Sequence, residues 1–360
     1  MIYICETFEE NDKVWFVGDL DNYLYCMDKK SMETSIVAQI PYLDERNNPY
    51  RANAKCIRYE ENIICFPDKS KDIQIYNTTN NAIDSIHIDL DARRLGIYNG
   101  WIYNGKIWCL TYSVGKLIKC DIELKKVEKI YNVCDSDGIS NAGEAVKNGE
   151  LLYFISKMDC KIIEFNMQNE NIREYDIACK DKGFGTILVD GDNIYLTGFE
   201  NCIYIWNKKN NTVEIIDLKD KITFAETSVG KASVRFFHSY LINDYIVFVP
   251  QNNYAYVCEE IIVLDKRNNA LKTYNLRCEG AERIPGEYFI YTFSKQNRVY
   301  IQDYKRDDFV VLDLITGRYT YEMMKMNKGK NIEFWRDNGI SGMKRESECM
   351  TLEGFIAGIK

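Results

Sequence analysis

Two residues in this sequence could share acid–base chemistry. His238 is one of only two histidines in the chain, and Glu144 precedes it in a different part of the sequence. An imidazole exchanges its proton near neutral pH and a carboxylate can accept that proton, so the two could act as general acid and base in a lyase or hydrolase reaction. A buried, hydrogen-bonded structural histidine is the competing interpretation. The other histidine, His87, lies in a predicted outer strand and is a weaker candidate.

Basic and aromatic residues gather in the longer connections between the predicted strands and indicate a binding surface. Arg and Lys at such places favour a carboxylate, a phosphate or an acidic segment of a partner protein, unless they are solvated charges that never meet. Tyr together with Arg is typical of interface hot spots. The predicted ligand-binding residues are Tyr50, Arg51, Arg93, Arg94, Lys182, Phe184, Arg235, Tyr254 and Arg283.

Motifs for cofactors and metals are missing from the sequence. Gly230-Lys-Ala-Ser resembles part of a phosphate loop, but Ala225 stands where the first glycine is required. Gly183-Phe-Gly has neither the third glycine of a dinucleotide fingerprint nor a helix after it. The thirteen cysteines are scattered singly, without a CxxC pair, and their number is odd. We therefore expect no cofactor, no zinc site and no disulfide framework, with most cysteines acting as small buried hydrophobic residues.

The charge and hydropathy of the chain exclude two broad classes of protein. A net charge of −8 and a pI near 5.2 argue against a general nucleic-acid-binding protein, which needs a basic surface for phosphates. No stretch approaches the roughly 20 apolar residues of a membrane span, and the start of the sequence lacks the basic and apolar regions of a signal peptide. We expect a cytoplasmic, monomeric protein that binds neither nucleic acid nor membranes.

The elements that must position these residues repeat seven times along the 360 residues. Short apolar runs rich in Ile, Val, Tyr and Phe, which favour strands, flank a two-residue turn in each repeat. Asn or Gly in such a turn supplies the positive φ of a tight hairpin. The turns are Asn11-Asp12, Glu61-Asn62, Asn104-Gly105, Asn148-Gly149, Asp190-Gly191, Asn243-Asp244 and Gln296-Asn297. With a second hairpin in every repeat, the pattern predicts an all-β fold, a seven-bladed β-propeller of four-stranded antiparallel blades.

The second hairpin of each repeat has its own signature. It opens at Asp28, Asn77, Asp121, Asn166, Asn207, Asp265 or Asp313, and the residue four positions later is Asn or Gly in four of the seven repeats. An Asx side chain can bond the backbone of the turn that it starts, and Asn or Gly suits the left-handed residue that closes it. Met32, Lys125 and Glu170 stand at the closing position in the other three repeats, where we expect slight strain or a different turn shape.

One copy of this signature carries a family resemblance. Asp313-Leu-Ile-Thr-Gly and its weaker copies resemble the corresponding turn of kelch-like and quinoprotein-like propeller repeats. The resemblance extends over residues 1–324 and implies the propeller fold alone. The double glycine of kelch repeats is absent, as are the Gly-His and Trp-Asp pairs of WD repeats, so no activity follows from it.

Seven blades and a tail divide the chain. We expect blades at 1–41, 53–89, 95–133, 143–177, 183–218, 234–276 and 287–324, followed by a tail at 325–360. Because no strand exchange between the chain ends is evident, the ring should close by packing between blades or through the tail. In the tail, Leu352, Phe355, Ile356 and Ile359 follow the spacing of one helical face after the N-cap residue Thr351. This short helix could cover an end of the ring or dock on another protein.

The connections between strands place function at one end of the ring. Both kinds of tight hairpin lie on one face, and connections of variable length, such as 41–54 and 250–260, lie on the other. Binding residues concentrate in loops on a rigid scaffold, so the loop-rich face is the candidate. We expect a non-catalytic protein that binds a protein or peptide partner, acidic in character, across this face. The alternative is a lyase or hydrolase that acts on an anionic small molecule or sugar in the central funnel, with His238 and Glu144 as proton-transfer groups.

Overall fold

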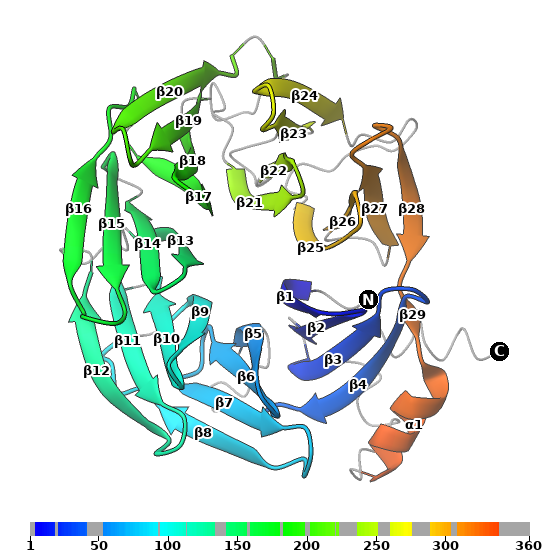
Figure 1. The fold of residues 1–360 in the computed structure, drawn as a ribbon. Helices are drawn as coiled ribbons and strands as arrows, with labels where there is room; N and C mark the ends of the chain where they lie inside the picture. Colours follow the sequence, from blue (N-terminus) through cyan, green and yellow to red (C-terminus); the bar gives the residue numbers. More distant parts are fainter. Residues whose placement is uncertain are drawn as a thin grey trace, which may run out of the picture.

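The computed structural model describes one closed ring. The described residues are 4–18, 21–41, 53–92, 94–112, 114–133, 142–156, 159–180, 183–198, 202–219, 221–222, 236–250, 260–275, 289–303 and 308–337. Seven antiparallel sheets, each built from four consecutive strands, surround a central axis (Figure 1). The all-β, seven-bladed propeller predicted from the repeat is confirmed.

The strands of each blade follow one another outward from the axis (Figure 1). Blade 1 consists of β1 (Ile4–Glu10), β2 (Lys13–Gly18), β3 (Tyr23–Asp28) and β4 (Glu33–Gln39), and blade 2 of β5 (Asn53–Tyr59), β6 (Asn62–Pro67), β7 (Asp72–Asn77) and β8 (Ile83–His87). Blade 3 consists of β9 (Ile97–Tyr103), β10 (Lys106–Thr111), β11 (Lys116–Asp121) and β12 (Lys126–Asn132), and blade 4 of β13 (Ala142–Asn148), β14 (Leu151–Ser156), β15 (Lys161–Asn166) and β16 (Ile172–Asp176). Blade 5 consists of β17 (Phe184–Asp190), β18 (Asn193–Gly198), β19 (Cys202–Asn207) and β20 (Thr212–Asp217), and blade 6 of β21 (Phe236–Ile242), β22 (Tyr245–Pro250), β23 (Glu260–Asp265) and β24 (Ala270–Asn275). Blade 7 consists of β25 (Phe289–Lys295), β26 (Arg298–Asp303), β27 (Asp308–Asp313) and β28 (Tyr319–Met323).

The apolar core is divided among the interfaces between neighbouring blades. Residues 63–66 of β6 are all fully buried, because both faces of a second strand lie against another blade. Each buried cluster joins two blades: Ile64 packs with Ile107 between blades 2 and 3, and Phe16 packs with Phe293 between blades 1 and 7. The sheets therefore stabilise one another in sequence around the ring.

The hairpin between the first and second strands has a positive φ at its first turn residue in all seven blades, at Asn11, Glu60, Asn104, Gly149, Gly191, Asn243 and Gln296. Four turns lie where the sequence places them, and those of blades 2, 4 and 5 lie one residue away. In blade 2, Tyr59 still pairs with Asn62, so Glu60 and Glu61 form the turn. In blades 4 and 5, Asn148 and Asp190 still pair in the ladder, and the glycine that follows supplies the positive φ.

The hairpin between the third and fourth strands confirms the Asx signature. In every blade the opening Asp or Asn accepts at least one hydrogen bond from the backbone of its turn, as Asp313 Oδ1 does from Thr316 N at 2.9 Å. The residue four positions later has a positive φ in all seven blades, including Met32, Lys125 and Glu170 at 61°, 52° and 61°. A Cβ disfavours this left-handed backbone, so these three turns carry the predicted strain.

A disulfide between Cys160 and Cys179 corrects the expectation of isolated cysteines. Their Cα atoms lie 6.3 Å apart, within the normal range for a disulfide. Cys160 precedes β15 and Cys179 follows β16, and the antiparallel pairing brings these two strand ends together although the residues are 19 positions apart. No CxxC-like spacing marks such a pair in the sequence.

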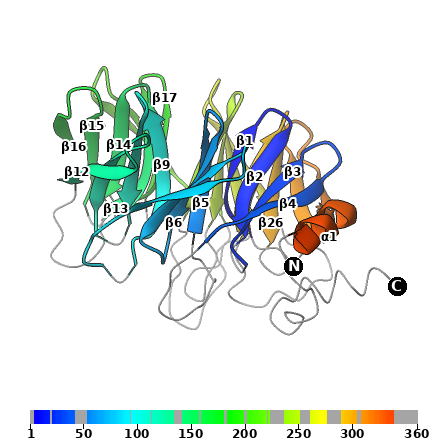
Figure 2. The same ribbon diagram turned by 90° about the horizontal axis from the view of Figure 1, so that it is seen from below.

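The segment after blade 7 closes the ring by adding to the outer edge of blade 1. β29 (Lys325–Met326) pairs in parallel with β4, and Lys325 N donates to Met32 O at 2.9 Å. Helix α1 (Lys328–Asp337) follows and lies outside the ring beside β4 (Figures 1 and 2). Asn331 Oδ1 of this helix accepts a hydrogen bond from Ile36 N at 2.8 Å, which continues the bonding along the strand edge. Ring closure thus uses both blade packing and the tail, the two routes that the sequence left open.

Helix α1, which the sequence analysis did not predict, follows closely after the last blade. Asn327 caps α1, because its Oδ1 accepts a hydrogen bond from Lys330 N at 3.1 Å. The helix predicted after Thr351 lies outside the described residues. Within the part of the chain that the structure describes, no helix has the length and apolar character needed to cross a membrane.

Replacing Asn331 by Ala should lower the free energy of unfolding by about 1–3 kcal/mol, because the buried Ile36 N would lose its hydrogen-bond acceptor. Urea unfolding followed by tryptophan fluorescence measures the change. Lys330→Ala is the matched control, since Lys330 is an exposed neighbour in the same helix. An N331A curve that coincides with the control would contradict a contribution of Asn331 to ring closure.

Candidate binding site at the loop-rich end

Polar residues occupy one register of the innermost strands in five successive blades. Lys55, Asn99, Thr186 and His238 each pair with the fifth residue of the neighbouring second strand, and Glu144 lies in a bulge of β13 at the same level. Each precedes the first residue of its hairpin turn by five positions, which sets it toward the end of the ring opposite the hairpins (Figure 2). We call Lys55, Asn99, Glu144, Thr186 and His238 the polar ring.

β-Bulges or similar irregularities interrupt all seven inner strands at or beside this level. The strand pairing shifts at residues 4–7 of β1, 53–55 of β5, 97–99 of β9, 142–145 of β13, 184–186 of β17, 236–238 of β21 and 291–293 of β25. A bulge redirects side chains and bends the strand locally. Gly185 is the extra residue in β17, and a Cβ there would lie 3.0 Å from Phe236 O. The glycine therefore allows blades 5 and 6 to approach each other closely beside the polar ring.

Glu144 and His238 meet across blade 5. His238 Nδ1 lies 3.4 Å from Glu144 Oε1, and Ile187 N of β17 donates a hydrogen bond to Glu144 Oε2 at 3.0 Å. The side chains of Glu144 and His238 are 19% and 13% exposed. Blades 4 and 6 are not neighbours, so their inner strands can make this contact only on the axis side of β17. The structure thus brings together the two residues that the sequence marked for acid–base chemistry.

Three members of the polar ring were missed by the sequence analysis. Lys55 and Asn99 are half-buried, whereas Thr186 is fully buried with its Oγ1 3.0 Å from Thr197 Oγ1. Thr186 N also donates a hydrogen bond to Thr197 Oγ1 at 3.1 Å. The pair of threonines therefore stabilises the β17 bulge. The constant offset of five residues from the turn is the signal that could have found all three. Glu6 and Tyr291 occupy the same offset in blades 1 and 7.

Arg94 and Phe184 are the predicted ligand-binding residues that lie in the described part of the chain. Arg94 binds the buried carboxylate of Asp68, with Nη2 2.7 Å from Oδ2 and Nε in contact with Oδ1. Phe184 is fully buried and packs edge-to-face on Tyr204, with ring centroids 5.7 Å apart. Phe184 thus belongs to the core rather than to an exposed binding surface, because the first residue of β17 points into the apolar cluster between blades 4 and 5.

The remaining residues of the predicted binding surface stay a prediction. Tyr50, Arg51, Arg93, Lys182, Arg235, Tyr254 and Arg283 lie outside the described residues. Where the structure does describe side chains, it groups no three His, Cys, Asp or Glu residues in a way that could hold a metal ion.

Comparison with known proteins gives a fold and no family. No protein-family model matches the chain, and no curated protein matches it by sequence. The structure is similar to that of a catalytically inactive His-to-Ala variant of virginiamycin B lyase from Staphylococcus aureus, crystallised with quinupristin, with a TM-score of 0.59 at 13% identity over 84% of this chain and 92% of that one. It is also similar to KlHsv2 carrying a Gly-Ser linker in place of one loop (TM-score 0.58, 8% identity, 90% and 98% covered) and to the computationally designed Ika8 protein (0.56, 10%, 90% and 90%). At such low identity these similarities establish the propeller fold alone.

Replacing Glu144 by Ala should lower the free energy of unfolding by about 1–3 kcal/mol, because the buried Ile187 N would lose its acceptor. Glu144→Gln should cost less, since the amide oxygen can still accept that hydrogen bond. Chemical denaturation measures both, and Glu150→Ala is the control because Glu150 is an exposed turn residue of the same blade. Equal losses in the Ala and Gln variants would show that the charge facing His238, and not the bond to Ile187, holds the three blades together.

Proposed function

We propose that the protein is a non-catalytic, cytoplasmic propeller that binds a protein or peptide partner across its loop-rich face. The observation that carries this proposal is the polar ring, in which residues from five blades occupy one level of a rigid scaffold near the variable connections. We assign the repeats to the kelch-like type on the Asx turn that Asp313 exemplifies.

The contacts of Glu144 favour binding over catalysis. Its Oε1 faces His238 and its Oε2 accepts the hydrogen bond from Ile187 N. A general base needs an oxygen within hydrogen-bond reach of the substrate proton, and both oxygens here already contact the protein. The carboxylate therefore suits a role in holding three inner strands beneath a bound ligand.

The charges at this end favour an acidic ligand. Lys55 belongs to the polar ring, and the sequence places Arg51, Arg235 and Arg283 in connections at the same end. Carboxylates form strong charge-assisted hydrogen bonds with such cations. Arg94 contributes little to this charge because Asp68 neutralises it. We propose that a monomer binds an acidic peptide segment and binds neither nucleic acid nor membranes.

A peptide-display selection with the full chain as bait tests the proposal. We expect the selected peptides to be rich in Asp and Glu. In fluorescence polarisation, the Tyr50→Ala/Arg51→Ala/Arg235→Ala variant and the Lys55→Ala/Asn99→Ala variant should each weaken binding roughly tenfold or more, the scale of an interface hot spot. Thermal unfolding of both variants should stay close to that of the unmodified protein.

The matched control changes the opposite face. Lys30, Asn80 and Lys209 are exposed residues of the hairpin turns, and their replacement by Ala should leave peptide affinity unchanged. Binding that is lost in this control and retained in the other two variants would move the site to the hairpin face and refute its placement at the polar ring.

The contact between His238 and Glu144 favours a second candidate, a lyase or hydrolase that acts on an anionic small molecule or sugar. A carboxylate at Nδ1 can orient an imidazole for proton transfer. Among similar propellers, virginiamycin B lyase is catalytically inactive as a His-to-Ala variant. A turnover screen of anionic small molecules and sugars separates the candidates. Turnover that disappears in His238→Ala would support the enzyme, and peptide binding without turnover would support the partner-binding protein.

A further inference from the structure

We propose that the Cys160–Cys179 disulfide is a reversible redox latch on the polar ring. When oxidised, it ties the chain that leaves blade 4 toward blade 5 to the start of β15, and thiol–disulfide exchange with a dithiol removes that covalent tie. The proposal rests on the proposed function in two places: the cytoplasmic location sets the potential at which the latch opens, and the last step is that the state of the latch changes the affinity for the ligand.

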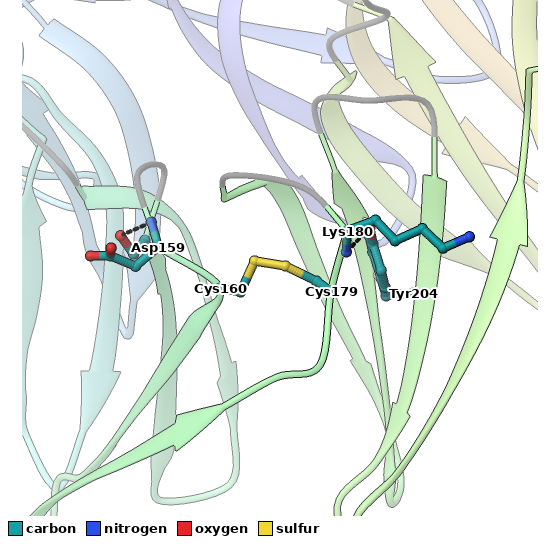
Figure 3. Close-up of a disulfide and its surroundings, with 6 residues drawn as sticks. Asp159, Cys160, Cys179, Lys180 and Tyr204 are labelled. Carbon is teal, nitrogen blue, oxygen red and sulfur yellow. Dashed lines mark hydrogen bonds between the residues drawn. A yellow bond between two sulfur atoms is a disulfide. The ribbon is translucent and has the colours of Figure 1, made fainter.

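The bridge holds a segment that the strand pairing does not. Ile177 N donates to Cys160 O at 2.8 Å, so the ladder between β15 and β16 extends as far as residue 177. Cys179 lies beyond this last bond and is joined to the start of β15 through the disulfide (Figure 3). Opening the bridge therefore removes the covalent tie of Cys179 to the start of β15, at the beginning of the connection to blade 5.

A series of contacts leads from this segment to the polar ring. Lys180 N, next to the bridge, donates a hydrogen bond to Tyr204 Oη at 3.1 Å (Figure 3). Tyr204 packs on Phe184, the first residue of β17, and both rings are fully buried. Ile187 of the same strand donates its N–H to the ring residue Glu144. A change in the order of residues 178–180 thus reaches the polar ring through one strand.

The bridged cysteines are more exposed than the described free cysteines, except Cys26, which is partly exposed as well. Cys160 and Cys179 are half-buried at the edge of the cluster between blades 4 and 5. Burial raises the pKa of Cys56 to about 12 and the pKa of the partly exposed Cys26 to about 11. Exchange requires a thiolate and access to the sulfur, so these thiols should be inert. Burial also denies a reductant access to the sulfurs of Cys65, Cys109, Cys120 and Cys202.

Opening the latch is a balanced two-electron exchange. One thiolate of a dithiol reductant attacks a sulfur of the bridge, which yields a mixed disulfide and one cysteine thiolate. The second thiol of the reductant then displaces the other cysteine, so the reductant becomes a disulfide and Cys160 and Cys179 each gain a proton. Disulfides of cytoplasmic proteins are usually transient or redox-sensing, which agrees with the proposed location.

Thiol trapping tests whether the bridge opens. The full chain is equilibrated in glutathione buffers of stepped potential and blocked with N-ethylmaleimide, and labelled peptides are identified by mass spectrometry. We expect Cys160 and Cys179 to become labelled together as the buffer becomes reducing, with Cys56 and Cys65 unlabelled until the protein unfolds. A bridge that stays closed at the potential of cytoplasmic glutathione, or buried thiols labelled before it, would overturn the proposal.

Histidine NMR tests the coupling to the polar ring without any ligand. The two histidines give two imidazole signals, and His87, 64% exposed in blade 2, serves as the internal reference. Reduction of the protein, or the Cys160→Ser/Cys179→Ser replacement, should shift the His238 signal and leave His87 unchanged. Cys26→Ser is the matched control because Cys26 is a free cysteine in blade 1. A His238 signal that stays in place after confirmed reduction would refute the coupling.

Peptide affinity in the two redox states completes the experiment. We expect the Kd of the selected peptide to change by roughly fivefold or more, the usual range of coupling between two sites. Equal affinity in both states would overturn the last step. If His238 responds to reduction and no peptide binds in either state, the latch stands and the proposed function fails, so the two failures are distinguishable.

Discussion

Packing of each sheet against its two neighbours is the interaction on which the rest of the structure depends. Every apolar cluster of the described residues joins two adjacent blades, and the seven clusters together account for the seven interfaces of the ring. A four-stranded sheet with two apolar faces would leave most of that surface in water if it stood alone. Each blade therefore needs both neighbours, the ring has to close, and second strands such as β6 and β14 have nearly continuous apolar sequences.

Polar side chains reinforce the same interfaces. Each neighbouring pair of blades shares at least one link: Arg58–Glu10, Lys125–Asp84, Lys119–Glu170, Lys208–Glu164, Lys266–Asp190, Asn243–Asn297 and the Ser294 backbone with Glu9. Exposed ion pairs add little stability, so most of these links set the register of one blade against the next. Lys208 differs because its partner Glu164 is buried and its ammonium also lies 5.3 Å from the centre of the Tyr153 ring.

Local chemistry could be predicted from the sequence, and contacts between distant segments could not. Asp313 and its counterparts bond their own turns, so seven hairpins and hence seven blades followed from spacing alone. The turn of blade 2 shows the limit of such local prediction. Asn62 suits a turn position by its residue type, and only its pairing with Tyr59 in the ladder places the turn at Glu60 and Glu61. The hydrogen bond between Asn331 of α1 and Ile36 of β4, and the disulfide between Cys160 and Cys179, join segments that meet only after the chain has folded. The meeting of Glu144 with His238 depends on the curvature of the whole ring.

The closure of blade 1 by the tail also imposes an order on biosynthesis. Met32 O and Ile36 N leave the ribosome early, but the residues that bind them, Lys325 and Asn331, follow six further blades. Throughout that interval the nascent chain presents an uncovered strand edge, a feature that invites association with other chains. A product interrupted before residue 325 would keep that edge uncovered, so the outer edge of β4 distinguishes finished molecules from unfinished ones for any chaperone that binds exposed strands.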